Sequence, residues 1–132
     1  MIVVGTNILA YLYLPGAFTA RAEKLLAEHA QWAAPQLWRS EFRNILAGYM
    51  RRGSFDVQHA IALQREAEAL LVSSEYVVDS QAVLELVKRS DCSAYDCEFV
   101  ALAQMLGVKL VTMDAKLLKA FPKIAMSLGA QT

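Results

Sequence analysis

Cysteine is scarce in this 132-residue chain, which contains only Cys92 and Cys97. Their spacing of five positions fits neither a CxxC redox motif nor a pair of zinc ligands, and two cysteines cannot form a disulfide scaffold. We therefore expect both to be small buried side chains in a reducing compartment. Proline and glycine are also few, at three and six residues, and no low-complexity linker divides the chain.

An excess charge and long apolar runs are absent as well. Thirteen basic and thirteen acidic residues balance, so no overall field attracts a polyanion, and any surface for nucleic acid must be local. No apolar run reaches the roughly 18 residues that a membrane-spanning helix needs. A strand is expected from residue 2, which leaves no room for a signal peptide. We therefore expect a cytoplasmic protein with no membrane partner.

Apolar side chains are abundant, at 56% of the residues. A single domain of this length buries roughly two-thirds of its unfolded surface, which is enough for a substantial core. The apolar excess can belong to that core or to a surface that a partner covers. The residues open to both interpretations are Leu12, Tyr13 and Leu14 before Pro15, and Val57, Ile61, Leu63, Leu70 and Leu71.

Short apolar stretches alternate with helical patterns along the chain. The patterns predict strands at 2–5, 33–34, 75–78, 108–112 and 124–127, and helices at 6–13, 20–30, 36–52, 56–72 (capped by Ser54 or Asp56), 80–89, 94–106 and 114–120. Strands separated by helices require right-handed crossovers and a parallel sheet covered on both faces. The predicted fold class is α/β: one domain, 1–132, forming a three-layer α/β/α sandwich with a short parallel sheet. Ligands bind such sheets beyond the carboxyl ends of the strands.

Glu41 interrupts the apolar side of the helix predicted at 36–52. It follows Trp38 by three positions and precedes Ile45 by four, and both spacings make helical neighbours. Burying an unpaired carboxylate costs several kcal/mol, so Glu41 needs a cation, hydrogen bonds or a wet cleft. The ordinary alternative is a glutamate at the edge of the apolar side that reaches solvent or pairs with Arg39 or Arg43.

Two aspartates occupy comparable positions. Asp96 precedes Phe99 and Val100 by three and four positions, whereas Glu98 points to the opposite side and is expected at the surface. Asp114 follows the strand predicted at 108–112. The ordinary alternatives are a favourable interaction with the helix dipole for Asp96 and an N-cap for Asp114.

Taken together, the three acids indicate a shared site. Glu41, Asp96 and Asp114 are expected to converge at one edge of the sheet, where their mutual repulsion favours a bound hard cation. Oxygen ligands of this kind suit Mg²⁺ or Mn²⁺ rather than zinc.

The segments that carry these acids resemble PIN-domain ribonucleases, specifically the small VapC-like toxins of type II toxin–antitoxin pairs. The matching segments are IVVGTNILAYL, WRSEFRNIL and SAYDCEFVALAQMLGVKLVTMDAKLL, in the family's order over essentially the whole chain. The resemblance implies Mg²⁺- or Mn²⁺-dependent cleavage of RNA phosphodiesters. It also implies a homodimer and inhibition by a cognate antitoxin whose tail covers the cleft.

The resemblance also assigns the site residues. The positions that match the family's motifs are Thr6, Asn7, Glu41, Asp96, Thr112 and Asp114. The first motif has an aspartate where this chain has Gly5. By position, Asp96 and that missing carboxylate would be the primary metal pair, with Glu41 and Asp114 completing the shell or orienting water. We expect Gly5 to weaken or abolish activity, whether it is natural or was selected because an active toxin harms its host.

Three cations are expected to contact RNA near the cleft: Arg39, Arg43 and Lys116. The ordinary alternative is that they are scattered solvated surface. The apolar excess, if exposed, could bind an antitoxin helix or a second copy.

Gly5 also favours a hypothesis from a different class, a non-catalytic PIN-like module that binds a protein or RNA without cutting it. A nucleotide-binding protein that uses Gly5-Thr6-Asn7 as a phosphate turn is a weaker third hypothesis, because one glycine is not a Gly-rich loop.

Overall fold

A five-stranded sheet forms the centre of the structure, a computed structural model that describes residues 1–130. Its strands are β1 (Ile2–Val4), β2 (Trp32–Pro35), β3 (Glu75–Tyr76), β4 (Leu110–Val111) and β5 (Ala125–Met126), in the order β3-β2-β1-β4-β5. Every neighbouring pair is parallel, and Val3 of the central strand pairs with Ala33 on one side and Leu110 on the other. The predicted parallel sheet is therefore confirmed.

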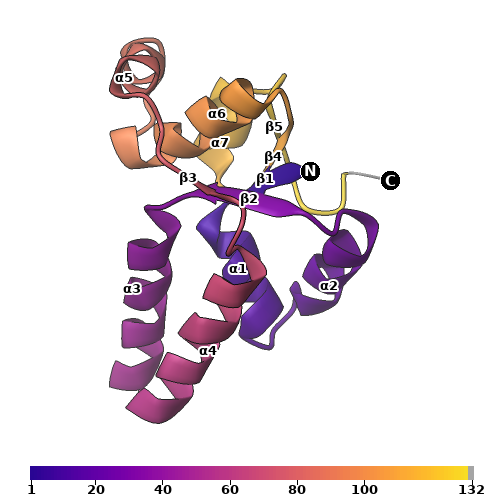
Figure 1. Cartoon of the computed structure of the whole chain (residues 1–132), viewed down its shortest axis with the longest axis vertical. Coiled ribbons are helices and arrows are strands. Elements are labelled where there is room, and N and C mark those ends of the chain that lie inside the picture. Colours follow the sequence, from indigo (N-terminus) through magenta and orange to yellow (C-terminus); the bar gives the residue numbers. More distant parts are fainter. Residues whose placement is uncertain (131–132) are drawn as a thin grey trace.

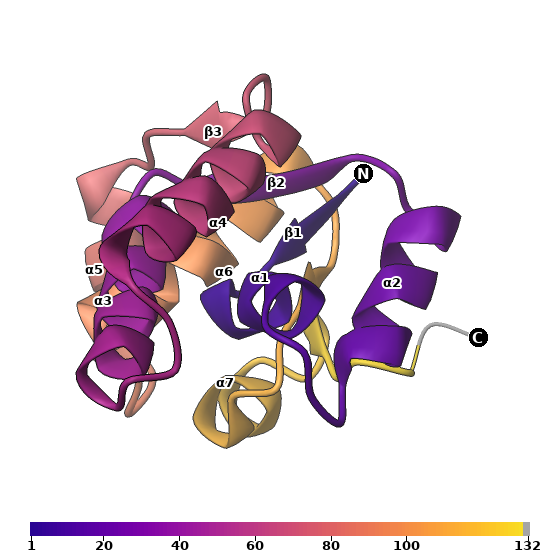
Figure 2. The ribbon, with the colours of Figure 1, turned by 90° about the horizontal axis from the view of Figure 1, so that it is seen from below.

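Helices cover both faces of this sheet (Figure 1). On one face lie α5 (Ser80–Lys88), α6 (Ala94–Leu106) and α7 (Ala115–Ala120). On the other lie α1 (Thr6–Tyr13), α2 (Thr19–Glu28), α3 (Trp38–Arg51) and α4 (Val57–Leu70). Seen from below, α3 and α4 run side by side on one side of α1, and α2 lies on the other side (Figure 2). The α/β/α sandwich predicted from the alternation is the observed architecture.

Element boundaries differ from the prediction mainly in the strands. The strand predicted at 75–78 pairs only over Glu75–Tyr76, because its neighbour β2 ends at Pro35 and the chain then turns into α3. Likewise, β4 covers only Leu110–Val111 of the predicted 108–112. The α4 helix is capped by Asp56, whose side chain accepts a hydrogen bond from the His59 N–H, and not by Ser54.

The core uses most of the apolar excess. Its largest fully buried side chains include Trp32, Trp38 and Phe42. Cys92 and Cys97 are buried and free, as predicted. The apolar residues open to two interpretations divide into three groups. Leu14 and Leu71 are buried, whereas the side chains of Val57 and Ile61 are exposed at 49% and 37%. The others are partly buried and pack against the core: Leu12, Tyr13, Leu63 and Leu70. Within residues 1–130, no helix combines the length and apolar character needed to cross a membrane.

Candidate active site

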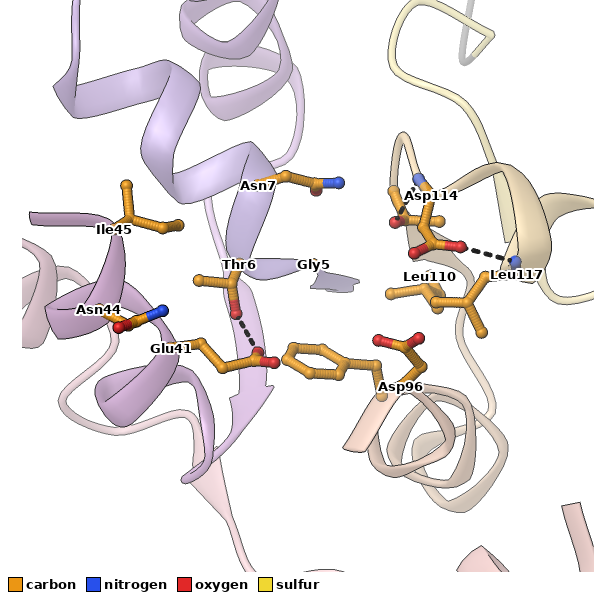
Figure 3. A pocket seen from close by; sticks show the side chains of 12 residues that line it. Gly5, Thr6, Asn7, Glu41, Asn44, Ile45, Asp96, Leu110, Asp114 and Leu117 are labelled. Atoms are coloured by element: carbon orange, nitrogen blue, oxygen red, sulfur yellow. Dashed lines mark hydrogen bonds between the residues drawn. The ribbon is translucent and has the colours of Figure 1, made fainter. Parts of the chain in front are cut away.

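The predicted acids line one pocket at the carboxyl ends of β1 and β4 (Figure 3). The pocket has a volume of about 300 Å³ and is lined by Gly5, Thr6, Asn7, Glu41, Asn44, Ile45, Asp96, Phe99, Leu110, Thr112, Asp114 and Leu117. Two strands meet there because the Gly5 N–H donates to the Val111 carbonyl over 2.9 Å. Side chains from four helices therefore meet at this edge of the sheet. They come from the starts of α1 and α7, which follow β1 and β4, and from the first turns of α3 and α6.

Glu41 enters the pocket from the first turn of α3. Its carboxylate accepts a 2.7 Å hydrogen bond from the Thr6 hydroxyl at the start of α1. Burial raises the pKa of Glu41 and the charges of Asp96 and Glu98 raise it further, while the Thr6 bond acts in the opposite direction. In the described part of the chain neither Arg39 nor Arg43 forms an ion pair with it, so the predicted alternative of an arginine partner is wrong there.

Asp96 and Asp114 face each other from α6 and from the start of α7. Burial and then the charge of Asp114 raise the pKa of Asp96, and Lys116 partly offsets this. Asp114 is also the N-cap of α7, with Oδ1 accepting from the Leu117 N–H over 3.0 Å. Its own N–H donates to the Thr112 hydroxyl over 3.1 Å. The cap uses one carboxylate oxygen, so the capping alternative and a place in the site are compatible.

Gly5 lies between these two groups of acids. Figure 3 shows it with Glu41 and Thr6 on one side and with Asp96 and Asp114 on the other. Its backbone is extended, with φ −68° and ψ 156°, which any L residue adopts. A Cβ atom here would lie 2.9 Å from Asn7 Oδ1 and 3.1 Å from Thr112 Oγ1. Only side-chain atoms stand in the way of a larger residue, and the space an aspartate needs is partly taken by the Asn7 amide.

The pocket residues have the ligand atoms that a divalent cation needs, but they are not arranged closely enough around one point. The pocket offers carboxylate, amide and hydroxyl oxygens, which are ligands for Mg²⁺ or Mn²⁺. Within residues 1–130, however, no three His, Cys, Asp or Glu side chains are close enough to hold one metal ion together. The gap at Gly5, between the two groups of acids, is where a further carboxylate would join them.

The predicted RNA contacts are not brought together. Arg39 donates through Nε and Nη2 to the two oxygens of Glu75, both over 2.6 Å, and its Nη1 is 3.3 Å from Glu68. It thus joins α3 to β3 and α4, away from the pocket. Arg43 lines a separate groove between α3 and α4. Of the three, only Lys116 acts electrostatically on the acids, because its charge lowers the pKa of Asp96.

The sequence analysis missed one polar residue of the pocket and predicted too much exposure for Glu98. Asn44 lines the pocket, three positions after Glu41, and that helical spacing could have revealed it. Glu98, expected at the surface, is partly buried, and burial raises its pKa. The reason is that α5 packs beside α6 and covers a side that helical periodicity assigns to solvent.

Comparison with known proteins identifies the fold family. The sequence profile of the PIN domain matches residues 2–123. The chain belongs to the PIN-domain family. It is 29% identical over 127 residues to ribonuclease VapC3 from Pyrobaculum aerophilum, with 93% of this chain and 96% of that protein aligned.

Solved structures share the fold of this PIN domain. PAE2754 from Pyrobaculum aerophilum superposes with a TM-score of 0.71 at 25% identity, covering 96% of this chain and 90% of that one. A toxin–antitoxin complex from Klebsiella pneumoniae superposes with a TM-score of 0.68 at 19% identity, covering 96% of each chain.

Proposed function

We propose that this PIN-domain protein is a VapC-like ribonuclease toxin that depends on Mg²⁺ or Mn²⁺, cleaves RNA phosphodiesters and is weakened by Gly5. The observation that carries the proposal is the convergence of Glu41, Asp96 and Asp114 on one pocket. Within residues 1–130 no basic side chain lies within ion-pair distance of any of them. Unpaired acids that repel one another are a costly arrangement unless a cation or a substrate uses them.

The proposed roles follow from position. Asp96 and, in the fully active form, a carboxylate at position 5 would be the primary metal pair, and Glu41 and Asp114 would complete the shell or orient water. When bound, the cation supplies neutralisation of the charge that develops on a phosphate oxygen. Thr6 fixes the Glu41 carboxylate through its 2.7 Å hydrogen bond, so that the carboxylate can orient a water molecule. The Asp114 carboxylate is held by the hydrogen bond that its Oδ1 accepts from the Leu117 N–H, and the Asp114 backbone is held by the hydrogen bond that its N–H donates to the Thr112 hydroxyl.

Restoring the missing carboxylate tests this proposal. The Gly5→Asp variant is expected to cleave a sensitive RNA at least about 100-fold faster than the present chain, in line with the effect of one preorganised charged group. Cleavage should require Mg²⁺ or Mn²⁺ and stop with EDTA. Gly5→Ala adds the Cβ without the charge, and Gly16→Asp adds the charge at an exposed position away from the pocket. If all four proteins are equally inert, the nuclease proposal fails.

An antitoxin partner is part of the same proposal. A groove of about 290 Å³ between α3 and α4 has an apolar floor that includes Leu46, Met50 and Ile61, with Arg43 and Arg65 among its lining residues. This composition suits an amphipathic antitoxin segment with acidic flanks. A small protein encoded beside this one should bind with lower affinity to the Val57→Asp variant than to the unchanged chain, and equal binding would count against the groove.

A homodimer and a cytoplasmic location complete the proposal. Size-exclusion chromatography with light scattering tests the dimer, because a monomer at every concentration would contradict it. Cell fractionation tests the location.

A second candidate function is a non-catalytic PIN-like module that binds RNA or a protein. It is favoured by Gly5 and by the lack of a group of three acids in ligating arrangement within residues 1–130. Calorimetric titration with Mn²⁺ distinguishes the two. Specific uptake by the Gly5→Asp variant supports the ribonuclease, and no uptake supports the binding module.

A further inference from the structure

All the charged side chains in the segment that follows Asp114 are basic. From residue 115 to the end of the sequence it contains Lys116, Lys119 and Lys123 and no acidic residue. All three lysines are exposed, and within residues 1–130 none is within ion-pair distance of an acid. In a chain with no net charge, this is a local excess of positive charge that begins at the rim of the acidic pocket.

A second cavity lies at the far end of α7. Its volume is about 300 Å³, and it is lined by Arg89, Ala120, Phe121, Pro122, Lys123 and Ile124. The Arg89 guanidinium lies over the Phe121 ring, 5.9 Å from its centroid. Stacking on an aromatic face restrains a guanidinium without neutralising it. The cavity therefore holds one preoriented cation beside a second, flexible one.

Two chain segments lead from this cavity to the acidic pocket: the loop that follows α5, and α7 itself. Arg89 begins the loop that leads through Cys92 to the Ser93 cap of α6, and Asp96 is in the first turn of that helix. Lys116 comes two positions after Asp114, the N-cap of α7, and Asp114 and Asp96 lie on the same side of the pocket (Figure 3). The α7 helix has six residues and a length of about 9 Å, so a few nucleotides span the distance from Lys116 to Phe121.

We propose that Arg89 and Lys123, together with Lys116, bind successive phosphates of an RNA strand that runs from the acidic pocket along α7. The inference rests on the proposed function and assigns it a substrate path, in place of the predicted contacts Arg39 and Arg43. Carboxylates at the pocket repel RNA, so binding requires cations that hold the flanking backbone. The loop that Arg89 begins, between α5 and α6, contains a single acidic residue, Asp91.

RNA fits this surface better than an acidic protein segment does. Protein interfaces usually have an apolar centre, whereas none of the large exposed apolar side chains of residues 1–130 lies after Met105. The exposed residues over 115–124 are lysines, alanines and a proline, and the neighbouring loop exposes Arg89 and Asp91. A polyanion bound mainly through its charges matches that composition.

The test measures RNA binding without cleavage, in the chain as it exists and in EDTA. Fluorescence anisotropy with a labelled single-stranded RNA is recorded against KCl concentration for the unchanged chain and for Arg89→Gln/Lys123→Gln. Affinity should fall roughly tenfold, and the slope of log K against log salt should fall by about 1.4, as expected for two lost phosphate contacts. The matched control is Arg21→Gln/Lys24→Gln on α2, where Arg21 also stacks on a ring, that of Phe18. This control should leave both values unchanged.

The outcomes separate this inference from the nuclease proposal. It is overturned if the unchanged chain does not bind RNA, if both double variants behave alike, or if a poly-glutamate peptide of equal charge competes as well as RNA. Lys123→Gln alone, on an exposed side chain, guards against misfolding of the double variant and should still lower the slope by about 0.7. RNA binding along α7 with no cleavage by Gly5→Asp would leave the inference standing and remove the nuclease.

Discussion

The amide oxygen of Asn7 lies 2.9 Å from the point that a Cβ atom on Gly5 would occupy. That oxygen is buried and has no hydrogen-bond partner within the described residues. Because an orphaned buried acceptor costs free energy, the arrangement is a compromise in which Asn7 occupies part of the space left by the absent side chain. The relation bears directly on how position 5 will respond to substitution.

Gly5→Ala should change the free energy of unfolding by less than about 1 kcal/mol. The extended backbone accepts alanine, and a smaller unfolded-state entropy favours the variant by about 0.4–1 kcal/mol. Against this stands the displacement of Asn7, whose contacting atom is at the end of a flexible side chain. Urea unfolding measures the difference. A loss above about 2 kcal/mol would mean that Asn7 and Thr112 cannot move aside, and the Gly5→Asp experiment would then need an accompanying Asn7 substitution.

Thr6→Val should raise the pKa of Glu41 further. The hydroxyl donates to the ionised carboxylate over 2.7 Å and favours the charged form, so its loss leaves burial and the charges of Asp96 and Glu98 unopposed. An NMR titration of the Glu41 carboxyl carbon measures this shift. Thr19→Val, which changes a hydroxyl at the start of α2, is the control and should leave the titration in place. An unchanged Glu41 titration in Thr6→Val would show that the hydrogen bond does not stabilise the carboxylate.

Without divalent cations, the acidic pocket should reduce stability as pH rises. The pKa values of Glu41 and Asp96 are both raised by burial above their ordinary values near 4. The folded state therefore binds their protons more tightly than the unfolded state does. Their stabilising contribution is fully present below the unfolded pKa and is lost as pH rises through the folded pKa.

Glu41→Gln should flatten this pH dependence in the range just above the ordinary glutamate pKa. Urea unfolding at a series of pH values in EDTA measures the slope. Glu85→Gln, on the exposed side of α5, is the control and should keep the original slope. The same slope in all three proteins would exclude a contribution from Glu41.

Glu75→Gln should destabilise the fold by about 1–3 kcal/mol at neutral pH. The carboxylate accepts from Trp38 Nε1 over 2.7 Å and from Arg39 through two bonds, and its side chain is only 10% exposed. The hydrogen bond from Arg39 lowers the pKa of Glu75, so this stabilisation is present above the unfolded pKa and is lost as pH falls. Glu68→Gln, at a 3.3 Å contact, should cost less. Equal losses in thermal and urea unfolding would contradict a special role for Glu75.

Much of the fold could be predicted because its signals are local. The capping aspartates Asp56 and Asp114 mark helix starts that the structure confirms, and Gly53 and Gly107, with φ of 77° and 67°, follow the ends of α3 and α6. Strand limits were predicted less well, because a β-branched residue such as Val77 favours a strand in the sequence pattern whether or not a neighbouring strand lies beside it. The pairing of β3 stops where its neighbour β2 ends, at Pro35.

The acidic pocket could be predicted because each acid interrupts an apolar pattern or follows a strand, and parallel strands place their carboxyl ends at one edge. The contacts that the basic side chains make could not be predicted. Arg39 and Glu41 are only two positions apart on one helix, a spacing that does not bring side chains together, and the partner of Arg39 is Glu75, 36 positions away along the chain. Nothing in the sequence indicates which acid such an arginine will meet.

The sequence by itself determined the order of strands and helices, the parallel sheet and the acids that meet at its edge, because hydrophobic periodicity and helix capping act over a few residues; that position 5 lacks a carboxylate followed only from the resemblance to the PIN family. Only the tertiary structure decided that Arg39 serves as a link between elements, that Asn7 takes space beside Gly5, and that Arg89 and Lys123 share a cavity at the end of α7. Those relations depend on contacts between distant segments, which form only when the layers pack together.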